Sequence, residues 1–266
     1  MIIPDWFYWL SFTVFGLIWG SFLNVCIYRW PKDPPENNII SPRSYCPNCR
    51  HTIAWYDNIP ILSFILLRGR CRHCGEKISL RYPLVELSSA GIWLLCYNLW
   101  GISAYTFIFI LYFSLLFVAS VVDIEHRIIP DEVSVGGAIL GLIISAIVPG
   151  LHGVSSHLQG FLSSFIGALT GGGLIYLVAV IGEFIFKKEA MGGGDVKLQA
   201  MIGAFLGWKW AILSFFVGCF IGSAIGIYQL IRYKDNTLPF GPALAMGSIV
   251  CLFWGDKILH LLFPIY

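Results

Sequence analysis

The residues best suited to catalysis are two aspartates, and each of them begins a polar stretch beside an apolar run. Asp123 begins residues 123–131 (DIEHRIIPD), and Asp195 directly follows the glycines at 192–194. Two carboxyl groups held within about 3–4 Å of each other do not both ionise easily, so one of them keeps a proton near neutral pH. The ionised group can then take a proton from water while the protonated group polarises a peptide carbonyl. If folding joins the two positions, the pair can hydrolyse a peptide bond.

Each aspartate also has a plainer interpretation, as a helix cap or as a charge anchored at the membrane boundary. We adopt it for the other acids in such places, which are Glu125, Asp131, Glu132, Glu183 and Glu189. The surroundings of Asp123 and Asp195 are less ordinary. Three glycines allow positive φ angles and close backbone approach beside Asp195. Pro130 favours an extended turn before the next helix, which Asp131 is able to cap.

Four cysteines have the spacing of a metal site. They form two CxxC pairs at residues 46–49 and 71–74, with 21 residues between the pairs. Two such turns suit a tetrahedral Zn²⁺ ion, and four protein ligands leave no open position for catalysis, so the metal is predicted to be structural. The predicted ligands are Cys46, Cys49, Cys71 and Cys74. The alternatives are two disulfides, unrelated free thiols, or replacement of one thiol by His51 or His73.

The remaining cysteines lie in apolar runs and are interpreted as small buried hydrophobic residues. They are Cys26, Cys96, Cys219 and Cys251.

The composition indicates that these groups belong to a membrane protein. Of the 266 residues, 57% are hydrophobic and 12% are charged, about half of the ~25% charged residues usual in soluble domains. Mean hydropathy is +0.76. This composition excludes a disordered chain, a collagen-like chain and a secreted disulfide scaffold.

The apolar runs predict an all-α polytopic membrane protein with about eight transmembrane helices. The first run is too long for a signal peptide, and no cleavable signal is expected. The expected spans are 6–27, two within 87–122 broken near 98–103, two within 133–182 broken near 149–157, a short one from 195 to 208, 210–231 and 240–254.

The basic residues predict the orientation of these spans. With eight spans, every one of the 17 Lys and Arg residues except Lys209 and Lys257 falls on one side of the membrane. Such a bias marks the cytosolic side, so both termini are expected outside. The chain then divides into a first transmembrane helix (1–27), a cytosolic zinc-binding insert (28–83) and a transmembrane core (84–266). We expect no nucleic-acid partner, and the oligomeric state does not follow from the sequence.

These residues, taken in order, resemble the bacterial type IV prepilin peptidases, the A24 aspartic membrane peptidases also called leader peptidase/N-methyltransferases. The resemblance extends over essentially the whole chain. It is carried by the CPNC pair and by residues 20–31 (GSFLNVCIYRWP), 57–63 (DNIPILS), 67–74 (LRGRCRHC), 81–86 (RYPLVE), 123–131, 192–197 (GGGDVK) and 240–242 (FGP). Residues 192–195 also fit the GxGD signature of presenilin-like intramembrane proteases.

The resemblance implies a catalytic dyad of Asp123 and Asp195 in a bacterial inner-membrane enzyme. The implied substrates are type IV prepilins or the pseudopilins of type II secretion, cut after a glycine at the end of a short basic leader on the cytosolic side. In bifunctional members the new amino terminus is then methylated with S-adenosylmethionine. The cysteine-containing insert is typical of those members. By similarity, the methylation-linked positions are Gly69, Arg70 and Glu86, although Gly69 also suits a structural turn and Arg70 a phosphate-facing charge.

The distribution of charge suggests how a basic leader is received. Residues 123–132 hold four acids (Asp123, Glu125, Asp131 and Glu132) against one base, Arg127, whereas residues 28–83 hold nine bases against four acids. We hypothesise that the acidic loop binds the leader and that the insert faces anionic lipid headgroups. Replacing Glu125 or Glu132 by Gln should then raise KM for lysine-bearing leaders severalfold at low salt.

Two other functions fit part of the pattern. A proton-coupled transporter also uses carboxylates at membrane depth, but it predicts internal repeats and midplane acids that the sequence does not show clearly. A scaffold whose zinc insert docks a secretion partner would leave Asp123 and Asp195 merely interfacial. In that case Asp123→Asn would be silent, whereas zinc depletion would abolish binding.

Overall fold

The protein is all-helical wherever its structure is described. The structure is a computed structural model that describes residues 4–33, 38–40, 43–187, 191–233 and 239–262. Four of the charged residues counted in the sequence lie outside these ranges: Glu36, Lys188, Glu189 and Lys234. Within them the only strand-like pairings are two isolated bridges, Tyr45 with Thr52 and Arg70 with Lys77.

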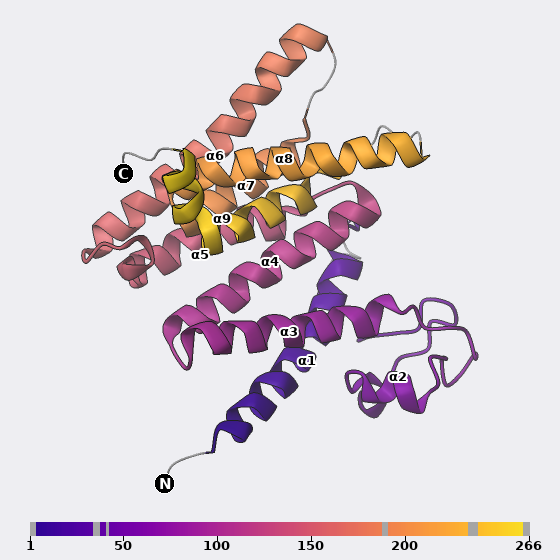
Figure 1. The fold of residues 1–266 in the computed structure, drawn as a ribbon. Coiled ribbons are helices and arrows are strands. Elements are labelled where there is room, and N and C mark those ends of the chain that lie inside the picture. Colours follow the sequence, from indigo (N-terminus) through magenta and orange to yellow (C-terminus); the bar gives the residue numbers. More distant parts are fainter. Residues whose placement is uncertain (1–3, 34–37, 41–42, 188–190, 234–238, 263–266) are drawn as a thin grey trace. The chain divides into compact units, whose positions relative to one another are not determined.

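The described residues form nine α-helices and two short 3-10 helices (Figure 1). In chain order these are α1 (Asp5–Arg29), η1 (Trp55–Asn58), α2 (Leu62–Leu66), α3 (Arg81–Trp100), α4 (Ala104–His126), α5 (Asp131–Ile147), η2 (Pro149–His152), α6 (His157–Phe186), α7 (Gly193–Leu206), α8 (Trp208–Tyr233) and α9 (Gly241–Leu262).

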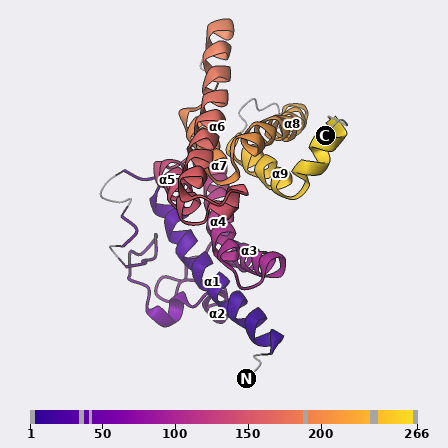
Figure 2. The ribbon, with the colours of Figure 1, turned by 90° about the vertical axis from the view of Figure 1, so that its left-hand side faces the viewer.

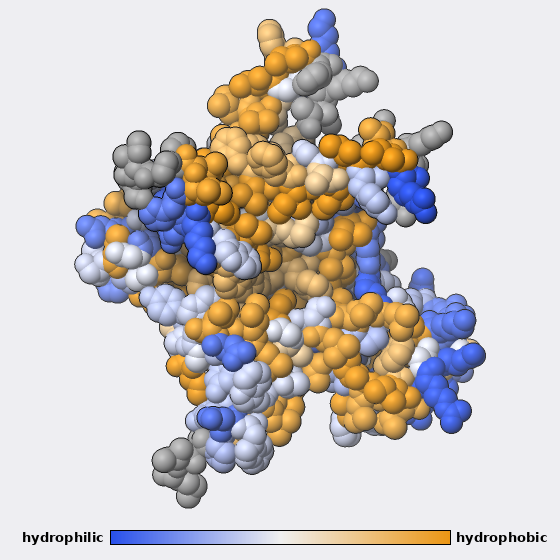
Figure 3. Space-filling view, in the orientation of Figure 1, coloured by the Kyte–Doolittle hydropathy of each residue, from blue (hydrophilic) through white to orange (hydrophobic). Residues whose placement is uncertain are grey.

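Five of the helices in the described ranges are long and apolar enough to cross a membrane: α1, α4, α6, α8 and α9. Their outer surfaces carry many large apolar side chains, such as Phe184 and Phe220, which are 86% and 80% exposed. In Figure 3 apolar side chains cover much of the visible helical surface, and hydrophilic side chains lie mainly toward its edges, including the edge near the insert. A surface of this kind is stable against lipid, so the chain is a membrane protein. The remaining long helices α3, α5 and α7 coincide with further predicted spans but are shorter or more polar.

The chain forms two compact units, residues 1–114 and 115–266, so the boundary falls within α4. In the first unit α1 and α3 pack along each other. A Cβ atom on Gly16 would lie 2.6 Å from the Cα atom of Ala90, and one on Gly20 would lie 2.6 Å from that of Glu86. Such close contact needs small residues, and it makes the two helices antiparallel. Residues 30–80 therefore connect the neighbouring ends of a helical hairpin.

In the second unit α7 is the central helix. It contacts α5, α6, α8 and α9, an arrangement visible in Figures 1 and 2. Its residues from Leu198 to Leu206 are buried, except for the half-buried Ala200. Gly203 meets the backbone of Gly167 in α6, and Gly171 meets that of Gln199. Gly171 and Gly172 therefore serve helix packing, whereas a Cβ atom on Gly173 would meet nothing within 4 Å.

Candidate active site and cysteine cluster

Asp123 lies in the last turn of α4 with its side chain buried. The residue is 6% exposed. Its Oδ2 atom accepts a hydrogen bond of 2.8 Å from the backbone N–H of Gly241, the first residue of α9. The first N–H groups of a helix have no partner within the helix and carry its positive dipole end. Burial of the side chain disfavours the ionised form of Asp123, and this contact opposes that effect.

Gly241 is a site residue that the sequence analysis did not identify. A Cβ atom at this position would lie 2.9 Å from Oδ2 of Asp123, so only glycine allows α9 to begin this close to the carboxylate. One signal for it is present in the sequence, a glycine between Phe240 and Pro242 directly before an apolar run.

Asp195 lies in the first turn of α7, outside the five candidate spans. Its side chain is half-buried, and the backbone of Gly192, the residue just before the helix, hydrogen-bonds to the carboxylate. Burial, and after it the negative charge of Asp123, raises the pKa of Asp195 to about 7, although the contact with Gly192 opposes this shift. A proton is therefore held on Asp195 up to near-neutral pH.

The fold brings the two predicted acids into one electrostatic unit within residues 115–266. The charge of Asp123 acts on the titration of Asp195, although 71 residues separate them in the chain. Asp123 has a fixed N–H donor, whereas Asp195 is the acid that retains a proton. Two carboxyl groups with unlike environments can serve as a base and an acid at the same pH.

The glycine run allows close approach, as expected, but it does not use positive φ angles. None of residues 192–194 has a positive φ angle, because Gly192 is extended and the other two already belong to α7. Gly194 instead allows close packing, since a Cβ atom there would lie 3.2 Å from the Cβ atom of Ile129. A Cβ atom on Gly193 would meet nothing within 4 Å.

Asp131 does not cap α5 as expected. It is the first residue of that helix, and Pro130 precedes it without a side-chain capping bond. Its Oδ1 atom instead accepts a hydrogen bond of 2.7 Å from Nζ of Lys197, two residues after Asp195. This exposed ion pair links the beginnings of α5 and α7. Glu132 is exposed and has no ion pair within the described ranges, so it stays available to a basic ligand.

The four cysteines of the insert converge as their spacing predicts. Their sulfur atoms all lie within 4.8 Å of one another, and the sulfur atoms of Cys46 and Cys74 are 3.8 Å apart. A tetrahedral ion with metal–sulfur bonds of about 2.3 Å requires sulfur atoms about 3.8 Å apart. The cluster could therefore hold a metal. All eight cysteines are free thiols, which argues against the two-disulfide alternative.

Each CxxC pair sits in a tight turn of the same form. The N–H of Arg50 donates to the carbonyl of Cys46, and the N–H of Gly75 donates to that of Cys71. Arg50 and Gly75 both have positive φ angles, 55° and 69°. Gly75 adopts this conformation without steric strain, whereas Arg50 adopts it with a side chain.

The three methylation-linked positions lie in the first unit, in two different settings. Gly69 has a φ of 66° and packs against the ring of Phe64, and Arg70 pairs in a bridge with Lys77. Glu86 is buried in α3, and its Oε2 atom accepts a 2.8 Å hydrogen bond from the N–H of Ile61. Within the described ranges no hydrogen bond or ion pair joins Glu86 to the other two.

Together these features define a class: an all-α membrane protein with a coupled pair of acids at helix ends and a four-cysteine insert. Comparison with known families agrees. The model of the bacterial peptidase A24 N-terminal domain matches residues 14–100, and that of the type IV leader peptidase family matches residues 110–227. The chain belongs to the type IV leader peptidase family, and it is a peptidase.

Curated relatives match nearly the whole chain. The type 4 prepilin-like proteins leader peptide-processing enzyme of Escherichia coli O78:H11 is 38% identical over 91% of this chain and 92% of its own. The prepilin leader peptidase/N-methyltransferases of Pseudomonas putida and Legionella pneumophila are 32% and 31% identical, each over 96% of this chain and over 93% and 94% of their own. No solved structure is significantly similar. Membership of a peptidase family does not favour the alternative that the chain is a proton-coupled transporter.

Proposed function

We propose that this enzyme removes the basic leader from type IV prepilins or pseudopilins at the cytosolic face of a bacterial inner membrane, and then N-methylates the new amino terminus. The electrostatic coupling of Asp123 and Asp195 is the observation that carries the proposal. The names of the relatives supply the substrate class and the methylation step. The proposed topology has eight spans, residues 28–83 in the cytosol and both termini outside, on the strength of the basic-residue bias.

In the proposed mechanism Asp123 is the base and Asp195 the acid. The Asp123 carboxylate takes a proton from water, whose oxygen attacks the carbonyl carbon of the scissile bond. Asp195 gives its proton to the carbonyl oxygen, and a tetrahedral intermediate forms. The proton on Asp123 then passes to the leaving nitrogen, the carbon–nitrogen bond breaks, and Asp195 recovers its proton as the carboxylic acid of the leader forms. The Gly241 contact supports this assignment because its N–H donor favours a charged Asp123.

The proposed metal is a structural Zn²⁺ ion held by Cys46, Cys49, Cys71 and Cys74. Four thiolates at near-tetrahedral separations fit it. The insert has little apolar core of its own, so the ion would hold its two turns together. The metal takes no part in peptide hydrolysis.

S-adenosylmethionine is the proposed methyl donor, and it would supply the methyl group to the new terminal amine. Gly69, Arg70 and Glu86 stay predictions for that step, since their contacts are those of a folded insert: a turn, a bridge and a link from α3 to Ile61.

The test is an assay on the full chain in detergent or lipid with a prepilin, with and without S-adenosylmethionine. Mass spectrometry should show loss of the leader, and with the methyl donor a product heavier by one methyl group. Asp195→Asn should leave the substrate intact while keeping the wild-type melting temperature. A folded wild-type enzyme that leaves the prepilin uncut would contradict the proposal.

A further inference from the structure

The short helix α2 of the insert carries its side chains in the opposite arrangement to a helix in water. Leu62, Ile65 and Leu66 share one side of the helix by their spacing and are 50%, 64% and 70% exposed. We call this side the apolar face of α2. The helix has one polar residue, Ser63, and that residue is buried. Helices at an aqueous surface place polar residues outside and apolar residues inside, so the apolar face of α2 requires a cover other than water.

Hydrogen bonds hold α2 in this orientation. The hydroxyl of Ser63 donates to the carbonyl of Tyr56 at 2.8 Å and accepts from the N–H of Ile59 at 3.0 Å. The N–H of Ile61, the residue before the helix, donates to Oε2 of Glu86 at 2.8 Å. This bond ties the start of α2 to the start of α3 (Figure 1). Turning the apolar face inward would break all three hydrogen bonds.

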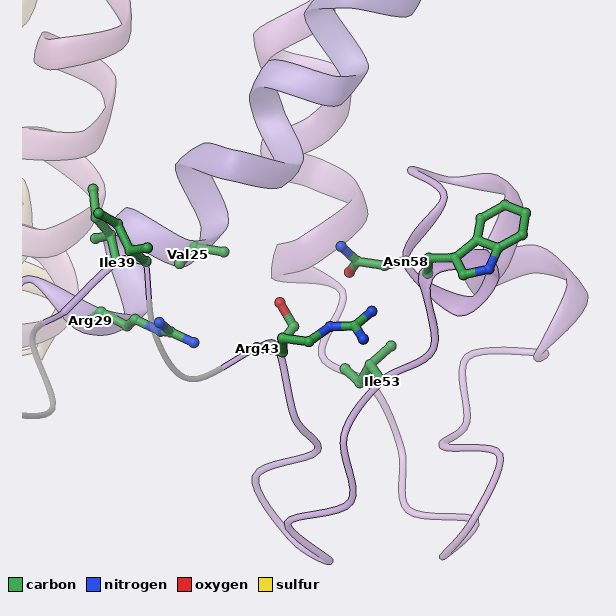
Figure 4. A pocket seen from close by; sticks show the side chains of 9 residues that line it. Val25, Arg29, Ile39, Arg43, Ile53 and Asn58 are labelled. Atoms are coloured by element: carbon green, nitrogen blue, oxygen red, sulfur yellow. The ribbon is translucent and has the colours of Figure 1, made fainter.

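The neighbours of α2 place it at the end of a candidate membrane span. α3, to which it is tied, packs antiparallel along α1 and exposes Leu84 and Leu87 in its first turns. An open pocket of about 310 Å³ lies between the last turns of α1 and η1, with Val25 and Asn58 on opposite sides (Figure 4). α1 is long and apolar enough to cross the bilayer and ends at Arg29. Because the end of a span lies near the headgroups, α2 belongs to the boundary between headgroups and acyl chains.

The residues around the apolar face are those of a membrane interface. Trp55 of η1, which packs against α2, is 72% exposed, and tryptophan is enriched at the depth of the headgroups. Arg68, which follows α2 closely, is exposed and is suited to anionic headgroups. Asp57 is the one acid in residues 55–70, and Arg72 neutralises it through hydrogen bonds of 2.6 and 2.8 Å. An apolar face with an aromatic and a basic neighbour favours lipid as its cover.

We infer that the apolar face of α2 inserts into the bilayer surface on the side where α1 ends, and that it anchors the insert to the membrane. Helices of this kind bury their apolar side about 5–10 Å into the boundary between headgroups and acyl chains. The contact adds apolar insertion to the electrostatic attraction that the basic residues of the insert predict. The inference does not depend on the proposed peptidase chemistry.

The experiment is photocrosslinking of the full chain in vesicles of phosphatidylethanolamine and phosphatidylglycerol. In Leu66→p-benzoylphenylalanine the crosslinker replaces a residue of the apolar face, and mass spectrometry should find phospholipid attached to the peptide that holds it. Phe64→p-benzoylphenylalanine is the matched control, because Phe64 lies on the same helix but packs against Gly69. Its lipid adduct should be lost in favour of adducts within the insert. Raising the salt from about 0.1 M to about 1 M screens charges and should leave the adduct of the Leu66 variant unchanged.

Several results would overturn the inference. Crosslinks from the Leu66 variant to a second copy of the chain would show that protein, not lipid, covers the apolar face. Equal lipid adducts in the two variants, or none in either, would show that α2 does not present this face to the bilayer. Loss of the adduct at high salt would reduce the contact to charge attraction. Wild-type melting temperatures of both variants exclude misfolding as the cause.

Discussion

Asp195 carries the titration on which the proposed chemistry depends. Its pKa of about 7 lies well above the usual range of an aspartate, so the acid form is present below pH 7 and is lost as the pH rises through that value. We predict that kcat/KM for leader cleavage falls about tenfold per pH unit above pH 7. A pH–rate profile from pH 5 to 9 tests this.

The substrate is not expected to produce this fall in activity. Leader lysines titrate near pH 10.4, so their ionisation lies outside the range that matters. A pH–rate profile that stays flat to pH 9 would show that leader cleavage does not require a proton on Asp123 or Asp195.

Gly241 tests the role assigned to Asp123. In Gly241→Ala the new Cβ atom would collide with the carboxylate that the N–H now holds. We predict a loss of about a hundredfold in kcat, because a displacement of about 1 Å at a reacting group has an effect of that size. Gly136→Ala is the control, since a Cβ atom there meets only the carbonyl of Asp131, at 3.8 Å. Comparable activity in the two variants would refute the positioning role.

The sequence indicates which acids are candidates for catalysis, but it does not show which contacts hold their side chains in place. Asp123 and Asp195 are recognisable from their neighbours in the chain, because a polar stretch beside an apolar run is a local pattern. The contact between Asp123 and Gly241 joins residues 118 positions apart, and no local pattern contains it. The positive φ of Arg50 was missed for a related reason: the metal turn imposes it against the preference of the residue.

At the scale of elements, the start of α7 decides where Asp195 lies. Gly194 packs against Ile129, whereas Gly193 faces open space. We predict that Gly194→Ala lowers activity severalfold, because its Cβ atom must push the two segments apart. Gly193→Ala should keep wild-type activity and gain about 0.5–1 kcal/mol of stability from the better helix former. The two variants are compared by measuring leader cleavage and thermal unfolding in the same detergent.

A different result for Gly193→Ala would be informative about the substrate. If this variant folds normally but loses activity, the open space beside Gly193 is where the substrate backbone approaches, and the packing account of the glycine run is wrong.

Helix positions were the most predictable level of the structure. The breaks expected near 98–103 and 149–157 correspond to the ends of α3 and α5 and to the starts of α4 and α6. Apolar length and the turn residues determine such breaks locally. Residues 192–194 do not use the positive φ angles that glycine allows, because glycines at a helix start adopt helical angles once a helix can form on them.

At the scale of the whole molecule, the chain has two compact units that hold different functional features. The first holds the insert and the cysteine cluster, and the second holds both aspartates. The sequence placed a boundary at the end of the insert, and that division stays a prediction. A unit boundary within α4 has no signal in the apolar run that continues through it.

Removal of the metal should affect the first unit selectively. We predict one Zn²⁺ ion per chain by elemental analysis, lost in Cys46→Ser and Cys74→Ser. Loss of a four-thiolate ion typically unfolds a small domain, so trypsin should then cut at Arg50 and Arg68 while residues 115–187 stay resistant. Zinc-free protein with an unchanged digestion pattern would show that the cluster needs no metal.

The central claim is that Asp123 and Asp195 act as one unit, and a double-mutant cycle on leader cleavage tests it most directly. The kcat/KM values of the wild type, Asp123→Asn, Asp195→Asn and the double variant are compared. Groups that act together are strongly non-additive, so each single variant should lose about a thousandfold or more and the double variant no more than the worse single one. Losses that multiply in the double variant, or a single variant that cleaves at the wild-type rate, would contradict the account.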